Sequence, residues 1–167
     1  MIREKRRGKD VAVWLMVGAS LCLMIYTTVR NQVIGQRTKK LIPEIAEGTR
    51  LGGLPLVDVT GLESTVPAEG RYLISMLDTQ CGPCKQQVDS LNSAAKDGAF
   101  SGVIAIFSEA PQRVRDFKEV IKPEFFCLID AGRGPISLHR ITTFPQTIEL
   151  SNGKVVRSWV GFHEHFE

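Results

Sequence analysis

The chain has 167 residues, of which 43% are apolar and 23% are charged, a composition typical of a globular domain with an additional segment. Its formal net charge of +3 is unevenly distributed. Residues 1–47 contain nine Lys or Arg and four Asp or Glu, whereas residues 48–167 contain twelve and fourteen. Because the larger part is slightly acidic, the composition argues against a nucleic-acid-binding domain, which needs basic residues clustered on its own surface.

A membrane anchor is predicted near the N-terminus. Residues 11–29 form an uncharged run of 19, which as a helix spans about 28 Å, close to the hydrocarbon thickness of a bilayer. The basic residues that precede it favour a cytoplasmic N-terminus and an extracytoplasmic body. The run is long for a cleaved signal peptide and no Ala-x-Ala site follows it, so we expect an uncleaved anchor in contact with lipid. Cleavage and a buried soluble helix are the alternatives.

Four regions are therefore expected along the chain. They are a basic cytoplasmic tail (1–10), a transmembrane anchor (11–29), a polar juxtamembrane stalk (30–50) and a folded domain (51–167).

The folded domain alternates strand and helix patterns. Strands are expected at 54–59, 71–77, 103–107 and 125–129, helices at 85–95 and 111–122, a short helix at 134–141, and a hairpin of 146–150 and 155–160. The turn Ser151-Asn-Gly-Lys154 supports the hairpin. This order predicts an α/β domain with a mixed central sheet flanked by helices.

The motif that indicates chemistry is Cys81-Gly82-Pro83-Cys84, which follows a predicted buried strand and opens a helix. Two cysteines at this spacing can close a small disulfide. The first lies at the positive end of the helix dipole, which favours the thiolate, the species that attacks in disulfide exchange. Pro83 falls in the first helical turn, where its missing N–H costs little. The second cysteine is expected to lie deeper and to resolve the mixed disulfide.

Two other interpretations of the cysteine pair are weaker. A structural zinc site usually takes four Cys or His ligands, and only Cys127 and three scattered His remain beyond the predicted anchor. A purely structural disulfide across two residues closes a loop too small to constrain the unfolded chain much. We therefore expect no metal and no cofactor beyond the redox-active Cys81–Cys84 disulfide.

These residues resemble a known family. Cys-Gly-Pro-Cys-Lys after a buried strand is similar to thioredoxin, and Thr143-Phe144-Pro145 before a strand resembles its cis-proline loop. The anchor, the strand and turn at 54–61, and the 61-residue interval from Cys84 to Pro145 resemble the TlpA/ResA group of membrane-tethered bacterial thiol–disulfide oxidoreductases. The resemblance covers roughly residues 50–162 and implies a thioredoxin fold.

The resemblance also implies roles for individual residues. It makes Pro145 cis and places it across the site from Cys81, with Gly82 and Pro83 as supporting residues. The backbone of Phe144 would pair with a substrate strand, helped by Thr143 and by Gln80, which stands where thioredoxins usually carry Trp. Core packing is the alternative role for Phe144.

The usual carboxylates of the family are missing at their expected places. Ser75 aligns with the buried Asp of thioredoxin, and Gln87 aligns with a Glu of some ResA-like proteins. Asp78 could substitute, although an exposed loop residue is the simpler interpretation. The C-terminal helix of the family is nearly absent.

The cysteines and histidines outside the motif are expected to be inert. Cys127 reads as a buried apolar residue, and Cys22 falls within the predicted anchor. His163 and His165 form a His-x-His that is expected to be a solvated end, with a metal ligand pair as the alternative.

The expected function is dithiol–disulfide exchange with extracytoplasmic protein thiols and disulfides at the bacterial cytoplasmic membrane. Reduction is the more common role in the family, including the maturation of cytochrome c or another metalloprotein, and it would need a membrane protein as electron donor. The direction of exchange depends on the partner that resets Cys81 and Cys84, so oxidation is the alternative direction. The alternative is a tethered assembly factor or copper chaperone that binds without turnover. A peroxidase is disfavoured, because Asp78-Thr-Gln-Cys81 lacks the Thr-x-x-Cys pattern.

Overall fold

The computed structural model describes residues 17–28, 30 and 45–166. The chain divides into two units, Met1–Ile42 and Pro43–Glu167. In the first unit, residues 17–28 are helical and their side chains are exposed. Residues 11–16 and 29 of the predicted anchor lie outside the described residues. Within the part of the chain that is described, no helix has both the length and the apolar character needed to cross a bilayer.

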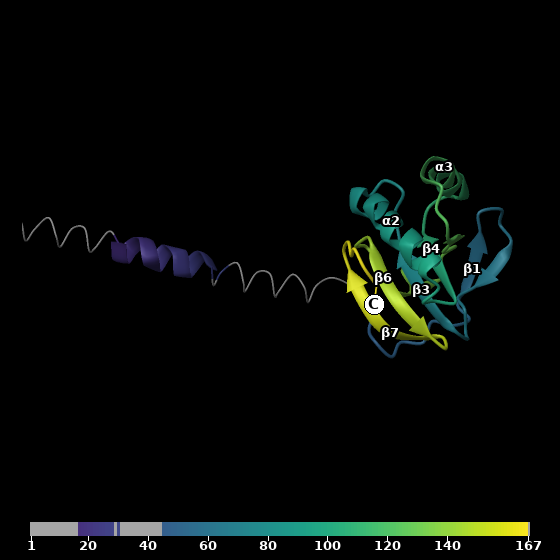
Figure 1. Cartoon of the computed structure of the whole chain (residues 1–167), viewed down its shortest axis with the longest axis horizontal. Coiled ribbons are helices and arrows are strands. Elements are labelled where there is room, and N and C mark those ends of the chain that lie inside the picture. The colour runs from purple at the N-terminus through teal and green to yellow at the C-terminus, as the bar shows by residue number, and fades with distance from the viewer. Residues whose placement is uncertain (1–16, 29, 31–44, 167) are drawn as a thin grey trace, which may run out of the picture. The chain divides into compact units, whose positions relative to one another are not determined.

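A seven-stranded mixed sheet forms the centre of the second unit, in the order β2-β1-β5-β4-β3-β6-β7 (Figure 1). The strands are β1 (Pro55–Asp58), β2 (Glu63–Thr65), β3 (Arg71–Met76), β4 (Gly102–Phe107), β5 (Phe126–Ile129), β6 (Gln146–Ser151) and β7 (Lys154–Val160). Strands β3, β4 and β5 are parallel, and the other pairings are antiparallel. The predicted mixed α/β architecture is confirmed.

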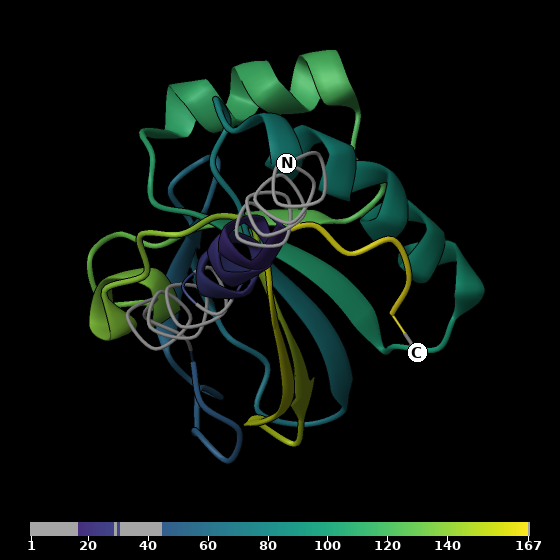
Figure 2. The same cartoon turned by 90° about the vertical axis from the view of Figure 1, so that its left-hand side faces the viewer.

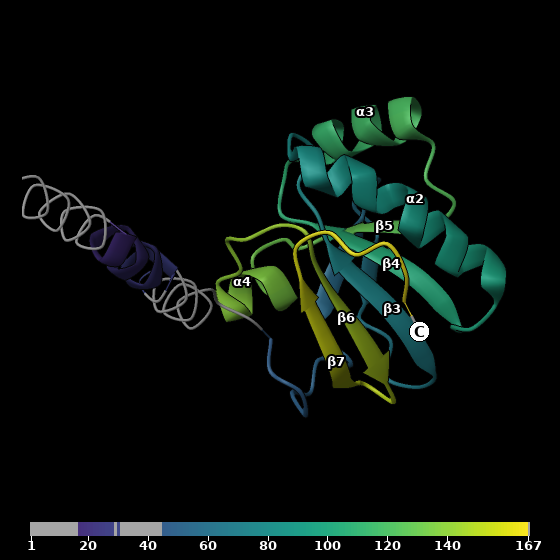
Figure 3. The same ribbon diagram turned by 60° about the vertical axis from the view of Figure 1, so that its left-hand side comes forward.

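Helices cover both faces of this sheet. Helices α2 (Gly82–Asp97) and α3 (Pro111–Ile121) lie side by side on one face (Figure 3). Their apolar sides pack on a core that includes Leu73, Ala105 and Cys127. The short helix α4 (Pro135–His139) contributes to the core on the opposite face, which contains Ile74 and Ile104. Because alternate residues of a strand point to opposite faces, the central strands are apolar almost throughout, as predicted.

The described end of the predicted stalk packs on the domain. Ile45 is fully buried, and the amide of Gly48 donates a hydrogen bond of 2.7 Å to the carbonyl of Val155. The amide of Val155 in turn donates to the carbonyl of Thr49 at 2.9 Å. Residues 45–50 therefore extend the domain beyond the expected start at 51.

One strand was not predicted from the sequence. β2 pairs with β1 in antiparallel register, yet its residues Glu63, Ser64 and Thr65 include none that is apolar. A short polar edge strand carries no alternating signal, because its outer side is open to solvent. The hairpin that it makes with β1 extends the sheet beyond β5.

Candidate active site

The cysteine pair lies at the connection between β3 and α2. β3 ends at Met76, and Cys81 is the N-cap of α2. Cys84 lies in the first turn of the helix and is fully buried, whereas Cys81 is half-buried. The two residues form a disulfide with their Cα atoms 5.2 Å apart. The expected difference in depth between the two sulfurs is confirmed.

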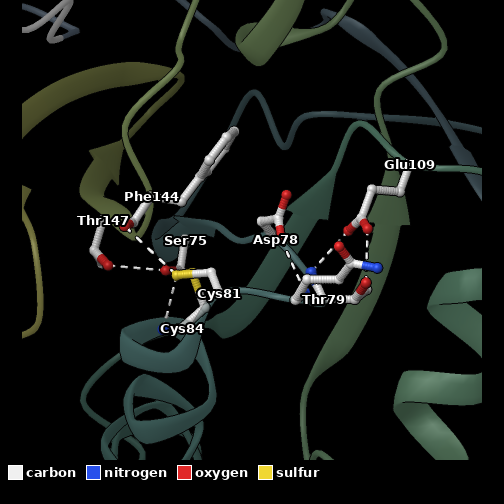
Figure 4. Close-up of a disulfide and its surroundings, with 9 residues drawn as sticks. Ser75, Asp78, Thr79, Cys81, Cys84, Glu109, Phe144 and Thr147 are labelled. Carbon is white, nitrogen blue, oxygen red and sulfur yellow. Dashed lines mark hydrogen bonds between the residues drawn. A yellow bond between two sulfur atoms is a disulfide. The ribbon is translucent and has the colours of Figure 1, made fainter.

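The start of α2 gives the outer sulfur a favourable electrostatic environment. The amide of Cys84 donates a hydrogen bond of 3.2 Å to Sγ of Cys81 (Figure 4). An N–H donor and the positive end of a helix both stabilise negative charge on that sulfur. Gly82 and Pro83 are exposed, so nothing within this turn screens Cys81 from a partner. The local geometry favours Cys81 as the thiolate when the disulfide is reduced.

The loop before β6 lies against the disulfide. The Phe144–Pro145 peptide bond is cis, as the resemblance implies. The carbonyl oxygen of Phe144 is 3.6 Å from Sγ of Cys81 (Figure 4). Pro145 is buried. Thr143 is partly exposed in this loop, and Gln80 is exposed on the cysteine side. Phe144 also packs on both cores, so its side chain has the alternative role in packing.

Two buried hydroxyl groups lie together on β3 and β6, and one of them belongs to Ser75, which the resemblance aligns with the buried Asp of thioredoxin. Ser75 and Thr147 are directly opposite each other in the pairing of β3 with β6, and their hydroxyl oxygens are 2.9 Å apart. Both residues are fully buried. Ser75 lies between Ile74 and Met76 of the opposite core, so alternation points it to the face that carries Cys84. Figure 4 shows the pair pointing toward the disulfide.

Two carboxylates hold the loop that leads into Cys81. Asp78 accepts a hydrogen bond from the amide of Gln80 at 2.8 Å. Glu109, in the loop after β4, accepts from the amide and the hydroxyl of Thr79 at 2.8 and 2.6 Å. Glu109 was not predicted from the sequence, because it lies 28 residues after Cys81 in a loop without a local pattern. Asp78 acts here as a loop cap.

The side chain of Gln87 binds the C-terminal segment. Its amide nitrogen donates to the carbonyl of His163 and its amide oxygen accepts from the N–H of His163, both at 2.8 Å. Trp159 packs edge-on against Phe166 and contacts the His163 ring. The tail after β7 thus runs back beside α2 (Figure 2). Of the expected solvated end, His165 is exposed and His163 is partly exposed, with its main chain bound by Gln87.

The remaining cysteines differ in their surroundings. Cys22 is exposed in the N-terminal unit, and Cys127 is buried on β5. Burial raises the pKa of the Cys127 thiol to about 11, against a smaller opposing effect of Lys118. Among the described residues, no group of three or more His, Cys, Asp and Glu side chains could hold a metal ion.

Comparisons with known proteins give the fold. No family model matches the sequence, and no curated protein matches it. A candidate thiol:disulfide interchange protein DsbE from Chlorobium tepidum superposes with a TM-score of 0.59 at 21% identity, over 71% of this chain and 88% of that one. The domain has a thioredoxin-like fold. StoA from Bacillus subtilis superposes with a TM-score of 0.57 at 18% identity, over 69% and 92% of the two chains.

The same fold also carries other chemistry. A peroxiredoxin-like protein from Aquifex aeolicus superposes with a TM-score of 0.54 at 15% identity, over 71% of this chain and 77% of that one. Because one fold can host several reactions, the function has to be argued from the site.

Proposed function

We propose that this chain is a thiol–disulfide oxidoreductase in which Cys81 attacks and Cys84 resolves. The observation that carries the proposal is the pair of sulfurs at the start of α2, with Cys81 half-buried and Cys84 fully buried. The amide of Cys84 donates to Sγ of Cys81, which favours a thiolate on the outer sulfur. The thioredoxin-like fold and the position of Phe144 beside Cys81 support the same assignment.

The reduced enzyme would act in two exchange steps. The Cys81 thiolate attacks one sulfur of a substrate disulfide, which forms a mixed disulfide and releases the other substrate sulfur as a thiolate. Cys84 then loses its proton and attacks Sγ of Cys81, so that the remaining substrate thiol leaves and the Cys81–Cys84 disulfide closes. The substrate has gained two electrons, and an external dithiol must return two electrons to Cys81 and Cys84 before the next cycle.

The loop around the site supplies positioning. The carbonyl of Phe144 faces the outer sulfur and would pair with the extended backbone of a substrate, with Thr143 and Gln80 at the edges of the contact. Glu109 and Asp78 fix residues 78–80, so Cys81 enters the helix from a constrained loop. Pro145 is the buried cis residue of the same loop, and the exposed Gly82 and Pro83 leave the approach open.

The cellular setting is part of the proposal. The uncharged run at 11–29 would tether the domain outside the bacterial cytoplasmic membrane, with residues 1–10 in the cytoplasm. A reductive role, including the maturation of cytochrome c or another metalloprotein, would then need a membrane protein that delivers electrons. A reporter fused after Glu167 tests the topology: activity outside the membrane supports it, and activity confined to the cytoplasm contradicts it.

Turnover and redox titration test the reaction. The detergent-solubilised full chain should reduce the disulfides of insulin with dithiothreitol as the electron source, and Cys81→Ser should abolish this activity. A reduction potential near that of thioredoxin, about −270 mV, would support a reductant, whereas one near that of DsbA, about −120 mV, would contradict it. A chaperone that binds without turnover predicts instead that the chain retains a thiol partner or Cu(I) and does not accelerate insulin reduction.

A further inference from the structure

A groove between α2 and α3 begins at the residue before Cys81. It is lined by Gln80 and Lys85 on one side and by residues of α3 on the other, and its volume is about 290 Å³. This is at the lower limit of pockets for small molecules, about 300–1,000 Å³, and so suits one or two side chains of an extended segment. The groove therefore begins one residue from Cys81, whose Sγ lies 3.6 Å from the carbonyl oxygen of Phe144.

The floor of the groove is apolar and partly uncovered. Phe117 is buried in the core, Ile121 is partly buried, and Val120 is 79% exposed. Val114, one turn before Phe117 in α3, is fully buried in the core and does not line the groove. The exposed valine beside the partly buried Ile121 offers a surface that an apolar side chain of a partner can bury.

The rim of the groove is predominantly basic. Lys85 forms no ion pair with any described residue. The guanidinium of Arg113 lies 4.0 Å from Glu109, whose carboxylate is already bound by Thr79. The carboxylate of Asp116 accepts a hydrogen bond of 2.7 Å from Gln112. The lining of the groove thus holds two cations, Lys85 and Arg113, and one carboxylate, Asp116, which favours an acidic group on the partner.

We propose that this groove binds the segment next to the attacked cysteine of a protein substrate, and that it selects an apolar and an acidic side chain on that segment. The apolar side chain would lie on Phe117 and Val120, and the acidic one would face Lys85 and Arg113. The substrate would cross Cys81 with one end on the backbone of Phe144 and the other in the groove. This inference rests on the proposed function and adds a substrate class to it.

Peptides with an activated disulfide test the inference. Each peptide carries one cysteine joined by a disulfide to thionitrobenzoate. The test peptide has Leu and Glu on one side of the cysteine, and the matched control peptide has Ser and Lys at the same positions. Peptides with these residues before the cysteine and peptides with them after it are tested separately. The Cys81 thiolate of the reduced full chain attacks the peptide sulfur and releases coloured thionitrobenzoate. The mixed disulfide of mercaptoethanol and thionitrobenzoate serves as a small reference. For one of the two sides, the Leu-Glu peptide should react about tenfold faster than its match, and this ratio should fall as salt increases.

Two matched substitutions locate the effect. Val120→Ser should lower the rate with the Leu-Glu peptide about fivefold relative to the small reference. Val156→Ser makes the same change at an exposed site on β7 and should alter neither rate. Lys85→Gln should reduce the preference for Glu and its salt dependence.

Other outcomes separate this inference from the proposed function. If the small reference reacts, equal rates for the matched peptides would contradict substrate selection by the groove and leave the proposed function intact. Equal effects of the two valine substitutions would have the same meaning. If neither the peptides nor the small reference reacts, both ideas fail.

Discussion

The hydroxyl groups of Ser75 and Thr147 form a buried pair, 2.9 Å apart, on the face of the sheet that carries Cys84. One of the two hydroxyls donates a hydrogen bond to the other, and both residues are fully buried. Removing one partner leaves the other buried and unsatisfied, which costs more than removing both.

A double-mutant cycle tests this pair. Ser75→Ala and Thr147→Val should each lower the free energy of unfolding by about 1–3 kcal/mol, and the double variant should lose less than the sum. Denaturant unfolding of the four oxidised proteins measures the coupling. Strict additivity would show that the two hydroxyls do not depend on each other.

The bond between Gln87 and His163 gives a prediction for the tail. Gln87→Ala removes two hydrogen bonds to the main chain of His163, so the free energy of unfolding should fall by about 1–3 kcal/mol. Hydrogen exchange at the His163 amide should accelerate at the same time. The neighbouring Gln86 is exposed, and Gln86→Ala provides the matched control with little effect expected. Unchanged exchange in Gln87→Ala would contradict a role for Gln87 in holding the tail.

Cys127 gives a prediction for pH. Its folded pKa is raised to about 11 from an ordinary 9.0, so between these values the folded state keeps a proton that the unfolded state has lost. The contribution of this thiol to stability is therefore complete below about pH 9 and declines as the pH rises toward 11.

Unfolding of the oxidised protein at pH 8 and at higher pH measures this effect. The wild type should lose about 2 kcal/mol more than Cys127→Ala across the window, because the variant lacks the titrating group. Iodoacetamide should also fail to label Cys127 in the folded protein at pH 8. Rapid labelling there, or equal pH dependence of the two proteins, would contradict the burial of this thiol.

The sequence predicts the elements that have a strong local signal. The buried runs at β3 and β4, the proline that starts α3 and the Asn152-Gly153 turn each correspond to an observed element. Helix α2 ends at Gly98, which has a φ of 69° that suits glycine. β2 was not predicted, because a polar edge strand forms by pairing with its neighbour, here β1, and has no alternating apolar pattern of its own.

The site was predictable only where the chemistry is local. Cys81 and Cys84 are identified by their spacing and by the strand before them. Glu109 and Thr147 reach the neighbourhood of the disulfide through the pairing of distant segments, which no local pattern reveals. In the sequence, Gln87 stands where some ResA-like proteins carry a Glu. In the structure, its side chain binds the main chain of His163.

Trapping of the mixed disulfide tests the central claim most directly. The full chain is prepared as Cys84→Ser and as Cys81→Ser, reduced, and mixed with insulin, and adducts are measured on non-reducing gels and by mass spectrometry. Because Cys84 is fully buried and Cys81 is half-buried, Cys84→Ser should accumulate a reducible adduct through Cys81, and Cys81→Ser should accumulate at least about tenfold less. Equal trapping by the two variants, or no adduct with Cys84→Ser, would contradict attack by Cys81 and resolution by Cys84.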